Sequence, residues 1–209
     1  MPIKLLIKKL YLDENRIITS NLLRNYCKKL GISYYGAIRY LISNKYLYRI
    51  LRGVFYKPSV EERKFNRIDI NYLDALVEAL KIKRVNNWYF GLETAIKLNN
   101  LTHEYFTTDF IINDIIFRAK AITLFGHKIK FIKLKGNLFD FGISKNKINF
   151  SNPEKTLLDI VYLSRYGGLG KSEINSKISG LLGHCSRNRL LKYSKKYNKS
   201  VESFVRELL

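Results

Sequence analysis

Apolar residues recur at helical spacing through the first part of the chain. Residues 2–12 are predicted to form a helix, and Thr19 or Ser20 can cap a second one. The apolar residues of this second helix share one face: Leu22, Leu23, Tyr26, Cys27 and Leu30. Gly31 supplies the left-handed residue that ends it. Ser33 then caps a third predicted helix, which runs to about residue 44.

Two short alternating segments follow the third helix. Residues 46–51 and 54–57 are predicted strands, and Arg52-Gly53 is the two-residue turn between them. Three helices followed by a hairpin are the parts of a winged helix-turn-helix. The third helix of such a domain fits the major groove of B-DNA, and the hairpin can reach the flanking backbone. We therefore expect residues 1–57 to form a DNA-binding domain.

The rest of the chain alternates between helical and strand patterns. Residues 58–68 mix charges around a proline and are expected to be a linker, and residues 69–209 a second domain. This domain is predicted to contain helices at 69–81 and 91–99 and strands at 104–111, 128–135, 138–143 and 146–150. A further helix is expected from Ser151, because Ser151 and Glu154 have capping-box spacing. The predicted fold class is α+β, with an N-terminal winged helix-turn-helix and a mixed α+β C-terminal domain.

The charge of the chain favours a polyanionic partner. Lys and Arg number 38 against 17 acidic residues, which gives a formal net charge of +21 among 209 residues. Residues 1–57 hold twelve of these basic residues and only two acidic ones. Nucleic acid is the first candidate. A membrane surface is second, but no stretch approaches the ~18 apolar residues of a membrane-spanning helix.

The N-terminal residues and the cysteines indicate the cellular compartment of the protein. Lys4, Lys8 and Lys9 interrupt the first apolar run, so it does not resemble a signal peptide. Cys27 and Cys185 are too few for a disulfide framework, and neither belongs to a CxxC pair. We expect a cytoplasmic protein that is not inserted in a membrane.

Candidate DNA-binding residues lie on the predicted third helix and hairpin. Ala37, Ile38, Leu41 and Ile42 form the inward face of the helix. Five residues are left pointing outward: Ser33, Tyr34, Tyr35, Arg39 and Tyr40. The hairpin adds three basic residues: Arg49, Arg52 and Lys57. Arg can bridge guanine O6 and N7, while Tyr and Ser hydroxyls can reach phosphates or base edges. The alternative is a solvated helix whose tyrosines pack against the second domain.

A second basic surface is predicted on the strand at 128–135. The segment alternates except at Phe131-Ile132, where a bulge would restore the pattern. Four lysines would then line one side: Lys128, Lys130, Lys133 and Lys135. One interpretation is a solvated strand edge guarded by lysine. The other is a docking surface for nucleic acid or an acidic protein.

Residue patterns typical of catalysis and metal binding are missing. The three histidines are scattered without metal-ligand spacing, and Asp109 and Asp114 are five positions apart. Gly168-Leu-Gly-Lys-Ser172 ends like a phosphate-binding loop, but Arg165 stands where that motif needs a glycine. We therefore expect no enzymatic activity, no metal and no cofactor.

Three segments together resemble a known family. They are Arg52-Gly-Val-Phe-Tyr56, Trp88-Tyr-Phe-Gly-Leu-Glu-Thr-Ala95 with the following Leu98-Asn-Asn-Leu101, and Ser151-Asn-Pro-Glu-Lys-Thr-Leu-Leu-Asp159. In this order they resemble the AbiEi-type antitoxins of type IV (abortive-infection) toxin–antitoxin systems and related transcriptional regulators. The resemblance implies a winged helix that binds duplex DNA, at repeats in its own promoter. It also implies a C-terminal domain that opposes a nucleotidyltransferase-like toxin, an opposition that need not involve a stable complex.

Two other functions remain open from the residues alone. One is a stand-alone winged-helix transcriptional regulator. The other is a basic RNA-associated structural protein, in which the lysine-rich second domain is the main binding surface. A neighbouring gene with a nucleotidyltransferase signature would favour the antitoxin over both.

Overall fold

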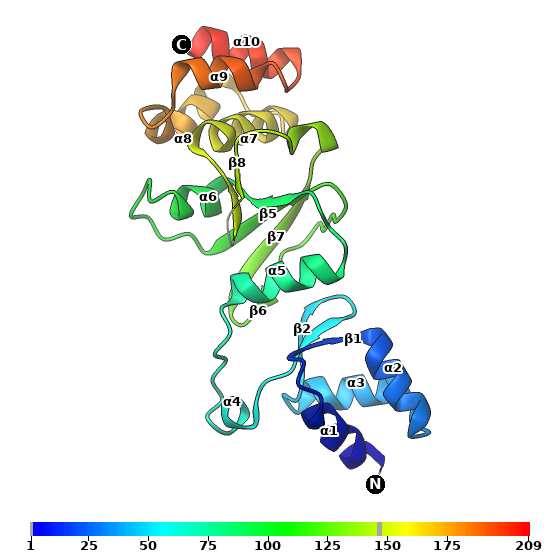
Figure 1. The fold of residues 1–209 in the computed structure, drawn as a ribbon. Helices are drawn as coiled ribbons and strands as arrows, with labels where there is room; N and C mark the ends of the chain where they lie inside the picture. The colour runs from blue at the N-terminus through cyan, green and yellow to red at the C-terminus, as the bar shows by residue number, and fades with distance from the viewer. Residues whose placement is uncertain (1, 146–147) are drawn as a thin grey trace. The chain divides into compact units, whose positions relative to one another are not determined.

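The chain folds into two compact units, residues 1–84 and 85–209, in this computed structural model (Figure 1). The structure describes residues 2–145 and 148–209. Helices and two β-sheets alternate along the described chain, so the predicted α+β fold class is confirmed.

The first unit combines five helices with a three-stranded sheet in the residues described. Its helices are α1 (Pro2–Leu12), α2 (Ser20–Lys29), α3 (Tyr34–Ser43), α4 (Val60–Lys64) and α5 (Tyr72–Ile82). Its strands are β1 (Ile17–Thr19), β2 (Tyr48–Leu51) and β3 (Val54–Tyr56). The sheet order is β1-β3-β2, with both pairs antiparallel. The sequence pattern identified the hairpin of β2 and β3 but missed β1.

Local signals in the sequence explain where α2 and α3 begin. The Thr19 hydroxyl accepts a hydrogen bond from the Leu22 amide at 3.3 Å, and Ser33 caps α3 from its extended backbone. Gly31, with φ of +62°, follows the end of α2 as predicted. Buried residues from α1, α2, α3 and the hairpin form one apolar core: Leu6, Leu10, Ile18, Leu23, Cys27, Ala37, Ile38, Leu41, Leu47 and Phe55. The unit therefore has a core of its own.

The division between the two units differs from the expected linker at 58–68. That segment contains α4, and Glu62 within it is only 3% exposed. The Glu62 carboxylate accepts hydrogen bonds from the Tyr56 hydroxyl at 2.7 Å and the Asp69 amide at 2.8 Å. Helix α5 also contacts β2 and β3. The first unit extends to residue 84 because these contacts hold residues 58–82 against it.

The second unit has a six-stranded mixed sheet. Its strands are β4 (Trp88–Phe90), β5 (Thr108–Asn113), β6 (Ile122–Leu124), β7 (His127–Lys133), β8 (Ile143–Lys145) and β9 (Asn149–Ser151). Their order is β6-β7-β5-β4-β9-β8. The pairs β5–β7 and β4–β9 are parallel, and the other pairs are antiparallel.

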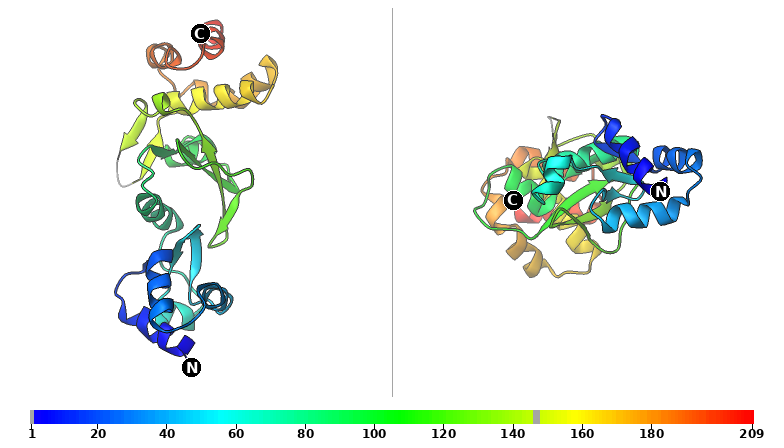
Figure 2. Two further views of the ribbon diagram at one scale, coloured as in Figure 1. Left: turned by 90° about the vertical axis from the view of Figure 1, so that its right-hand side faces the viewer. Right: turned by 90° about the horizontal axis from the view of Figure 1, so that it is seen from below.

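The helices of the second unit follow and flank this sheet. They are α6 (Leu92–Leu98), the short 3-10 helix η1 (Gly136–Leu138), α7 (Pro153–Tyr166), α8 (Lys171–Leu182), α9 (Arg187–Ser194) and α10 (Lys199–Leu208). Helices α7 to α10 lie together at the C-terminal end of the unit, beyond the strands (Figure 2). Their core centres on Leu157, Leu158 and Val161 of α7. Among the residues described, no helix has the length and apolar character to cross a membrane.

Several predicted boundaries in the second unit are corrected. The expected strand at 138–143 is wrong over most of its length: Leu138 ends η1, residues 139–142 bend, and β8 begins only at Ile143. Gly142 takes a φ of +64° in this bend. The first two positions of the expected strand at 146–150 lie outside the described residues, and β9 covers 149–151. Ser151 belongs to β9, so the cap of α7 is Asn152, whose side chain accepts from the Lys155 amide at 2.9 Å.

The predicted bulge in β7 is wrong. Strand β7 pairs with β5 in one continuous register from Lys128 to Lys133. Ile129 and Phe131 are buried on one face, and Ile132 packs into the apolar core on the other. Because this end of the sheet is covered on both faces, two consecutive apolar residues need no bulge. Lys133 consequently lies on the face opposite Lys128 and Lys130.

Candidate nucleic-acid interface

Helix α3 presents most of its predicted outward residues to solvent. Tyr35 is 73% exposed, and Ser33, Arg39 and Tyr40 are exposed as well. The opposite face carries Ala37, Ile38 and Leu41, which are buried as predicted. The helix therefore packs on its apolar side and leaves a basic and aromatic side free.

Tyr34 differs from the other outward candidates, because it packs partly against the core. Its hydroxyl donates to the Ser20 Oγ at 2.8 Å, and its ring lies 4.2 Å from the guanidinium carbon of Arg24. The same guanidinium is 5.9 Å from the ring of Tyr35. Arg24 thus joins the candidate surface beside the start of α3. Sequence reasoning missed it, although its position next to buried Leu23 on α2 was a usable signal.

The C-terminal end of α3 carries a second aromatic and basic cluster. The rings of Tyr40 and Tyr46 stack with centroids 6.3 Å apart, and the Arg63 guanidinium carbon lies 3.6 Å from the centroid of Tyr46. Arg63 also donates to the backbone carbonyl of Asn44 at 3.5 Å. Arg63 belongs to α4, so the expectation of a linker hid its contribution from sequence reasoning.

The hairpin turn is attached to the start of α2. Arg52 is exposed in this turn, and Gly53 has a φ of +80°. The Ser20 amide donates to the Gly53 carbonyl at 2.9 Å. Since the Ser20 hydroxyl also accepts from Tyr34, one residue connects the turn, α2 and α3. On β2, Arg49 is exposed with its guanidinium carbon 5.9 Å from the Phe55 ring.

Lys57 is not available to a ligand, which corrects its place among the candidates. Its side chain is buried, and its residue is only 6% exposed. The amino group donates to the carbonyl of Leu10 at 2.7 Å and to that of Asp13. Burial lowers the pKa of Lys57. The Lys57 amino group thus hydrogen-bonds carbonyls at the C-terminal end of α1. This structural role explains a lysine at this position without any contact to DNA.

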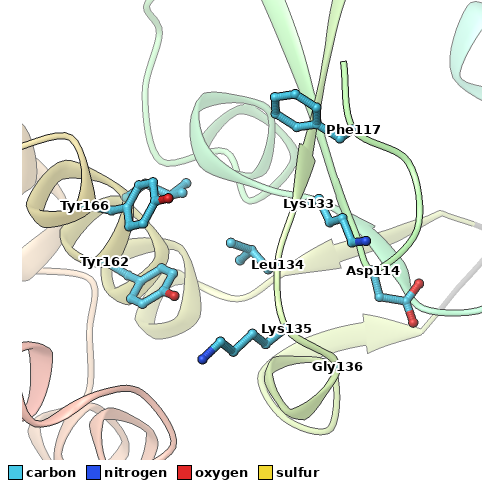
Figure 3. Close-up of a pocket in the computed structure, with 9 residues that line it drawn as sticks. Asp114, Phe117, Lys133, Leu134, Lys135, Gly136, Tyr162 and Tyr166 are labelled. Carbon is cyan, nitrogen blue, oxygen red and sulfur yellow. The ribbon is translucent and has the colours of Figure 1, made fainter. Parts of the chain in front are cut away.

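The four lysines of the predicted second surface do not form one row. Lys128 is exposed, and the Lys130 amino group donates to the Ala119 carbonyl. Lys133 and Lys135 instead line a pocket of about 600 Å³. Figure 3 shows the tyrosines of α7, Tyr162 and Tyr166, on the other side of this pocket.

The most conspicuous polar cluster of the second unit centres on three fully buried residues, Tyr89, Lys155 and Asp159. Asp159 accepts hydrogen bonds from the hydroxyls of Tyr89 at 2.8 Å and Tyr197 at 2.6 Å. The Lys155 amino group is 3.4 Å from Asp159 Oδ1 and faces the rings of Tyr89, Phe141 and Tyr197. Burial, together with the Asp159 charge, raises the pKa of both Tyr89 and Tyr197, and burial lowers that of Lys155. Because the Lys155 and Asp159 side chains are fully buried, the ion pair has a structural place in the core.

The histidines and the Gly168–Ser172 segment form neither a metal site nor a phosphate-binding loop in the described residues. No group of three or more His, Cys, Asp or Glu side chains could hold a metal ion within residues 2–145 and 148–209. The Gly168–Ser172 segment joins α7 to α8, with Gly168 at a φ of +79°. Lys171 pairs with Glu207 of α10. The segment therefore joins two helices, where a phosphate-binding loop would follow a strand.

Comparison with known proteins finds a similar fold in a solved structure. No protein-family model matches the chain, and no curated protein matches it. A solved structure, that of the RV2827C protein from Mycobacterium tuberculosis, is similar with a TM-score of 0.56. The alignment covers 97% of this chain and 74% of that one, at 15% sequence identity. At this identity the likeness concerns the fold alone.

Proposed function

We propose that the first unit is a winged helix-turn-helix that binds duplex DNA. The observation that carries this proposal is its topology, with β1 between α1 and α2, the β2–β3 hairpin after α3, and the sheet order β1-β3-β2. This arrangement leaves α3 free to enter a major groove.

The exposed side chains divide naturally into base-reading and backbone-binding groups. Arg39, in the middle of the free face of α3, is the candidate to bridge guanine O6 and N7. Arg24 and Arg52 lie beside the start of α3, where phosphates would flank the groove. The Arg39→Ala variant should relax sequence preference, whereas Arg52→Ala should weaken binding to all duplexes alike.

The charge of the first unit supports a polyanionic partner. Residues 1–84 contain eighteen Lys and Arg against seven Asp and Glu. Each phosphate contact releases counterions, so such a surface binds DNA in a salt-dependent manner.

We also propose that the protein is an antitoxin that represses its own promoter and counteracts a nucleotidyltransferase-like toxin. This proposal rests on the resemblance of three segments to AbiEi-type antitoxins. One of these segments, 151–159, lies at the centre of the second unit, where Asn152 caps α7 and Lys155 and Asp159 form the buried ion pair. In this proposal the second unit serves neutralisation and catalyses no reaction.

A co-expression growth assay tests the antitoxin proposal. The neighbouring gene is expressed as the toxin from an unrelated promoter, with the full chain or with residues 85–209. Full-length protein should restore growth, and residues 85–209 should keep part of the protection while losing promoter repression. Failure of the full chain to restore growth would refute the antitoxin role but leave DNA binding intact. A plain transcriptional regulator predicts that failure.

One observation favours a second candidate function, binding of RNA through the second unit. Exposed basic residues follow one another around α9: Arg187, Arg189, Lys192, Lys195, Lys196 and Lys199. A basic RNA-associated structural protein would use this surface. It predicts that residues 85–209 bind RNA at physiological salt as strongly as the full chain does.

A further inference from the structure

We propose that the pocket between residues 133–136 and α7 binds a nucleotide. The base would stack on aromatic rings from α7 and the 114–121 loop, and the phosphates would contact Lys133 and Lys135. This site lies within the second unit and is independent of the DNA-binding proposal for the first.

The size and walls of the pocket fit a ligand with a flat ring. Its volume of about 600 Å³ falls within the range of ~300–1,000 Å³ typical of small-molecule sites. Tyr162 and Tyr166 are one helical turn apart on α7, so both face the pocket (Figure 3). Tyr166 is 87% exposed and Phe117 is 70% exposed. Aromatic rings left open to solvent at the rim of a cavity offer stacking surfaces for a base.

The pocket has a positive side suited to phosphate. Lys133 ends β7, and Lys135 immediately precedes η1. Both are exposed, and both line the pocket around buried Leu134. The Lys133 amino group lies on the Asp114 side of the pocket and that of Lys135 on the Tyr162 side (Figure 3). Together they offer six N–H donors to phosphate oxygens.

Asp114 distinguishes a nucleotide from a simple anion. It stands on the wall away from the tyrosines, across Leu134 (Figure 3). Its Oδ2 accepts a hydrogen bond from the Asn87 side chain at 2.7 Å, which fixes the carboxylate. This negative charge disfavours a ligand made of phosphate alone. A nucleotide also brings ribose hydroxyls and base amino groups, which are donors that a carboxylate can accept.

The Tyr162 part of the stacking surface is packed on the core beneath it. The Tyr162 ring packs against the Tyr197 ring at a centroid distance of 5.7 Å, and Tyr197 is fixed by its hydrogen bond to Asp159. Leu163 and Leu134 belong to the same apolar core. Since the Tyr162 ring is already held by these contacts, stacking a base on it costs little conformational entropy.

Calorimetric titration of the full chain tests the proposal. The probes are the four ribonucleoside triphosphates, the matching nucleosides, inorganic phosphate, and a single-stranded RNA tetramer with a 5′-phosphate. At least one triphosphate should bind with a dissociation constant below about 1 mM, and more tightly than its nucleoside or inorganic phosphate. Stronger binding of the free triphosphate would identify a free nucleotide as the ligand, and stronger binding of the tetramer a terminal nucleotide of a strand.

Matched variants separate the pocket from general attraction of anions to a basic protein. Tyr166→Ala should weaken nucleotide binding about 5- to 150-fold, the range expected for loss of one stacking contact. The Lys133→Ala, Lys135→Ala double variant should weaken triphosphate binding more than nucleoside binding. Tyr105→Ala and Lys177→Ala are the controls, because Tyr105 is equally exposed and Lys177 is an exposed lysine, both outside the pocket. The proposal is overturned if neither the triphosphates nor the tetramer bind at millimolar concentration, or if the controls lose as much affinity as the pocket variants.

Discussion

Lys155 and Asp159 lie one turn apart on α7, with the lysine Nζ 3.4 Å from the aspartate Oδ1 and both side chains fully buried. The aspartate also accepts hydrogen bonds from Tyr89 and Tyr197, and the lysine faces three aromatic rings. A buried ion pair of this kind is tolerated only as a complete set, because a single remaining charge has lost its solvation without compensation.

Replacing Lys155 should therefore destabilise the second unit strongly. Lys155→Met leaves the Asp159 charge buried, and we expect it to lower the free energy of unfolding by about 3–5 kcal/mol. Chemical denaturation followed by tryptophan fluorescence measures this change, since Trp88 is the only tryptophan of the chain and is buried in the second unit.

The solvent-accessible pair of Arg206 and Glu202, with side chains 64% and 27% exposed, is the matched control. It has the same i,i+4 spacing on α10, with a distance of 2.7 Å. Arg206→Met should cost less than about 1 kcal/mol, because water already solvates both charges. Equal losses for the two variants would show that burial of the Lys155 pair has no energetic importance.

Gly142→Ala should destabilise the same unit through the backbone. Gly142 has a φ of +64°, and an added Cβ would lie 2.8 Å from the Lys155 Cβ and 3.1 Å from a ring carbon of Tyr193. Gly180→Ala on α8 is the control, because its Cβ would meet open space and helical alanine is favoured by roughly 0.5–1 kcal/mol. The two variants should change the melting temperature in opposite directions; a neutral Gly142→Ala would refute the close packing described around this glycine.

Cys185 should react slowly with thiol reagents in the folded protein. Burial first, and then the Glu154 charge, raise its pKa from 9 to about 12. At pH 8 the thiolate fraction is then about 1 in 10,000, against about 1 in 10 for a thiol of pKa 9. A kinetic assay with a chromogenic disulfide in a Cys27→Ala background should find a rate that rises about tenfold per pH unit from about pH 7 to about pH 10.

The Glu154→Gln variant tests how much the Glu154 charge contributes to the raised pKa of Cys185. Removing the negative charge should lower the pKa of Cys185 and speed the reaction at pH 8. A rate that levels off near pH 9 in the parent would mean that the thiol is not shielded by burial.

Lys57→Met should weaken the fold of the first unit without removing a DNA contact. The variant loses the hydrogen bonds to the Leu10 and Asp13 carbonyls, and we expect a cost of about 1.5–3 kcal/mol in unfolding free energy. Exposed Arg52→Ala should do the reverse, with little loss of stability and weaker DNA binding. The two effects are separated by measuring melting temperature and duplex affinity on the same samples, well below the melting temperature. If Lys57→Met kept the parent's melting temperature but bound duplex DNA more weakly, Lys57 would be a DNA contact after all.

Local patterns were sufficient to predict much of the first unit. The cap at Thr19, the left-handed Gly31 and the cap at Ser33 depend only on neighbouring residues, and each lies where the sequence indicated. Strand β1 was missed because three residues give no alternation to detect; its place is set by pairing with β3.

Long-range contacts explain what the sequence could not predict. The α4 segment was interpreted as a linker because its charges appear solvated, yet Glu62 is buried by partners such as Tyr56 and Asp69. Likewise, a basic residue such as Lys57 looks the same in sequence whether it faces DNA or closes a helix. The pocket at Lys133 and Lys135 is lined by residues from segments far apart in the sequence. No local sequence pattern could predict that they lie together.

The central claim is that the first unit binds DNA. The most direct test of it is the salt dependence of duplex binding by the full chain. Three proteins are compared: the parent, a first-unit variant with Arg24, Arg39 and Arg52 changed to Ala, and a second-unit variant with Lys192, Lys195 and Lys196 changed to Ala. If about 5–8 phosphates are contacted, the parent should show a slope of log affinity against log salt of roughly −4 to −7. The first-unit variant should reduce that slope by about 2, because Arg24 and Arg52 are the proposed phosphate contacts and Arg39 the base contact. The second-unit variant should reduce it by less than about 1. A parent that binds no duplex at low salt, or a slope lost only in the second-unit variant, would contradict the claim.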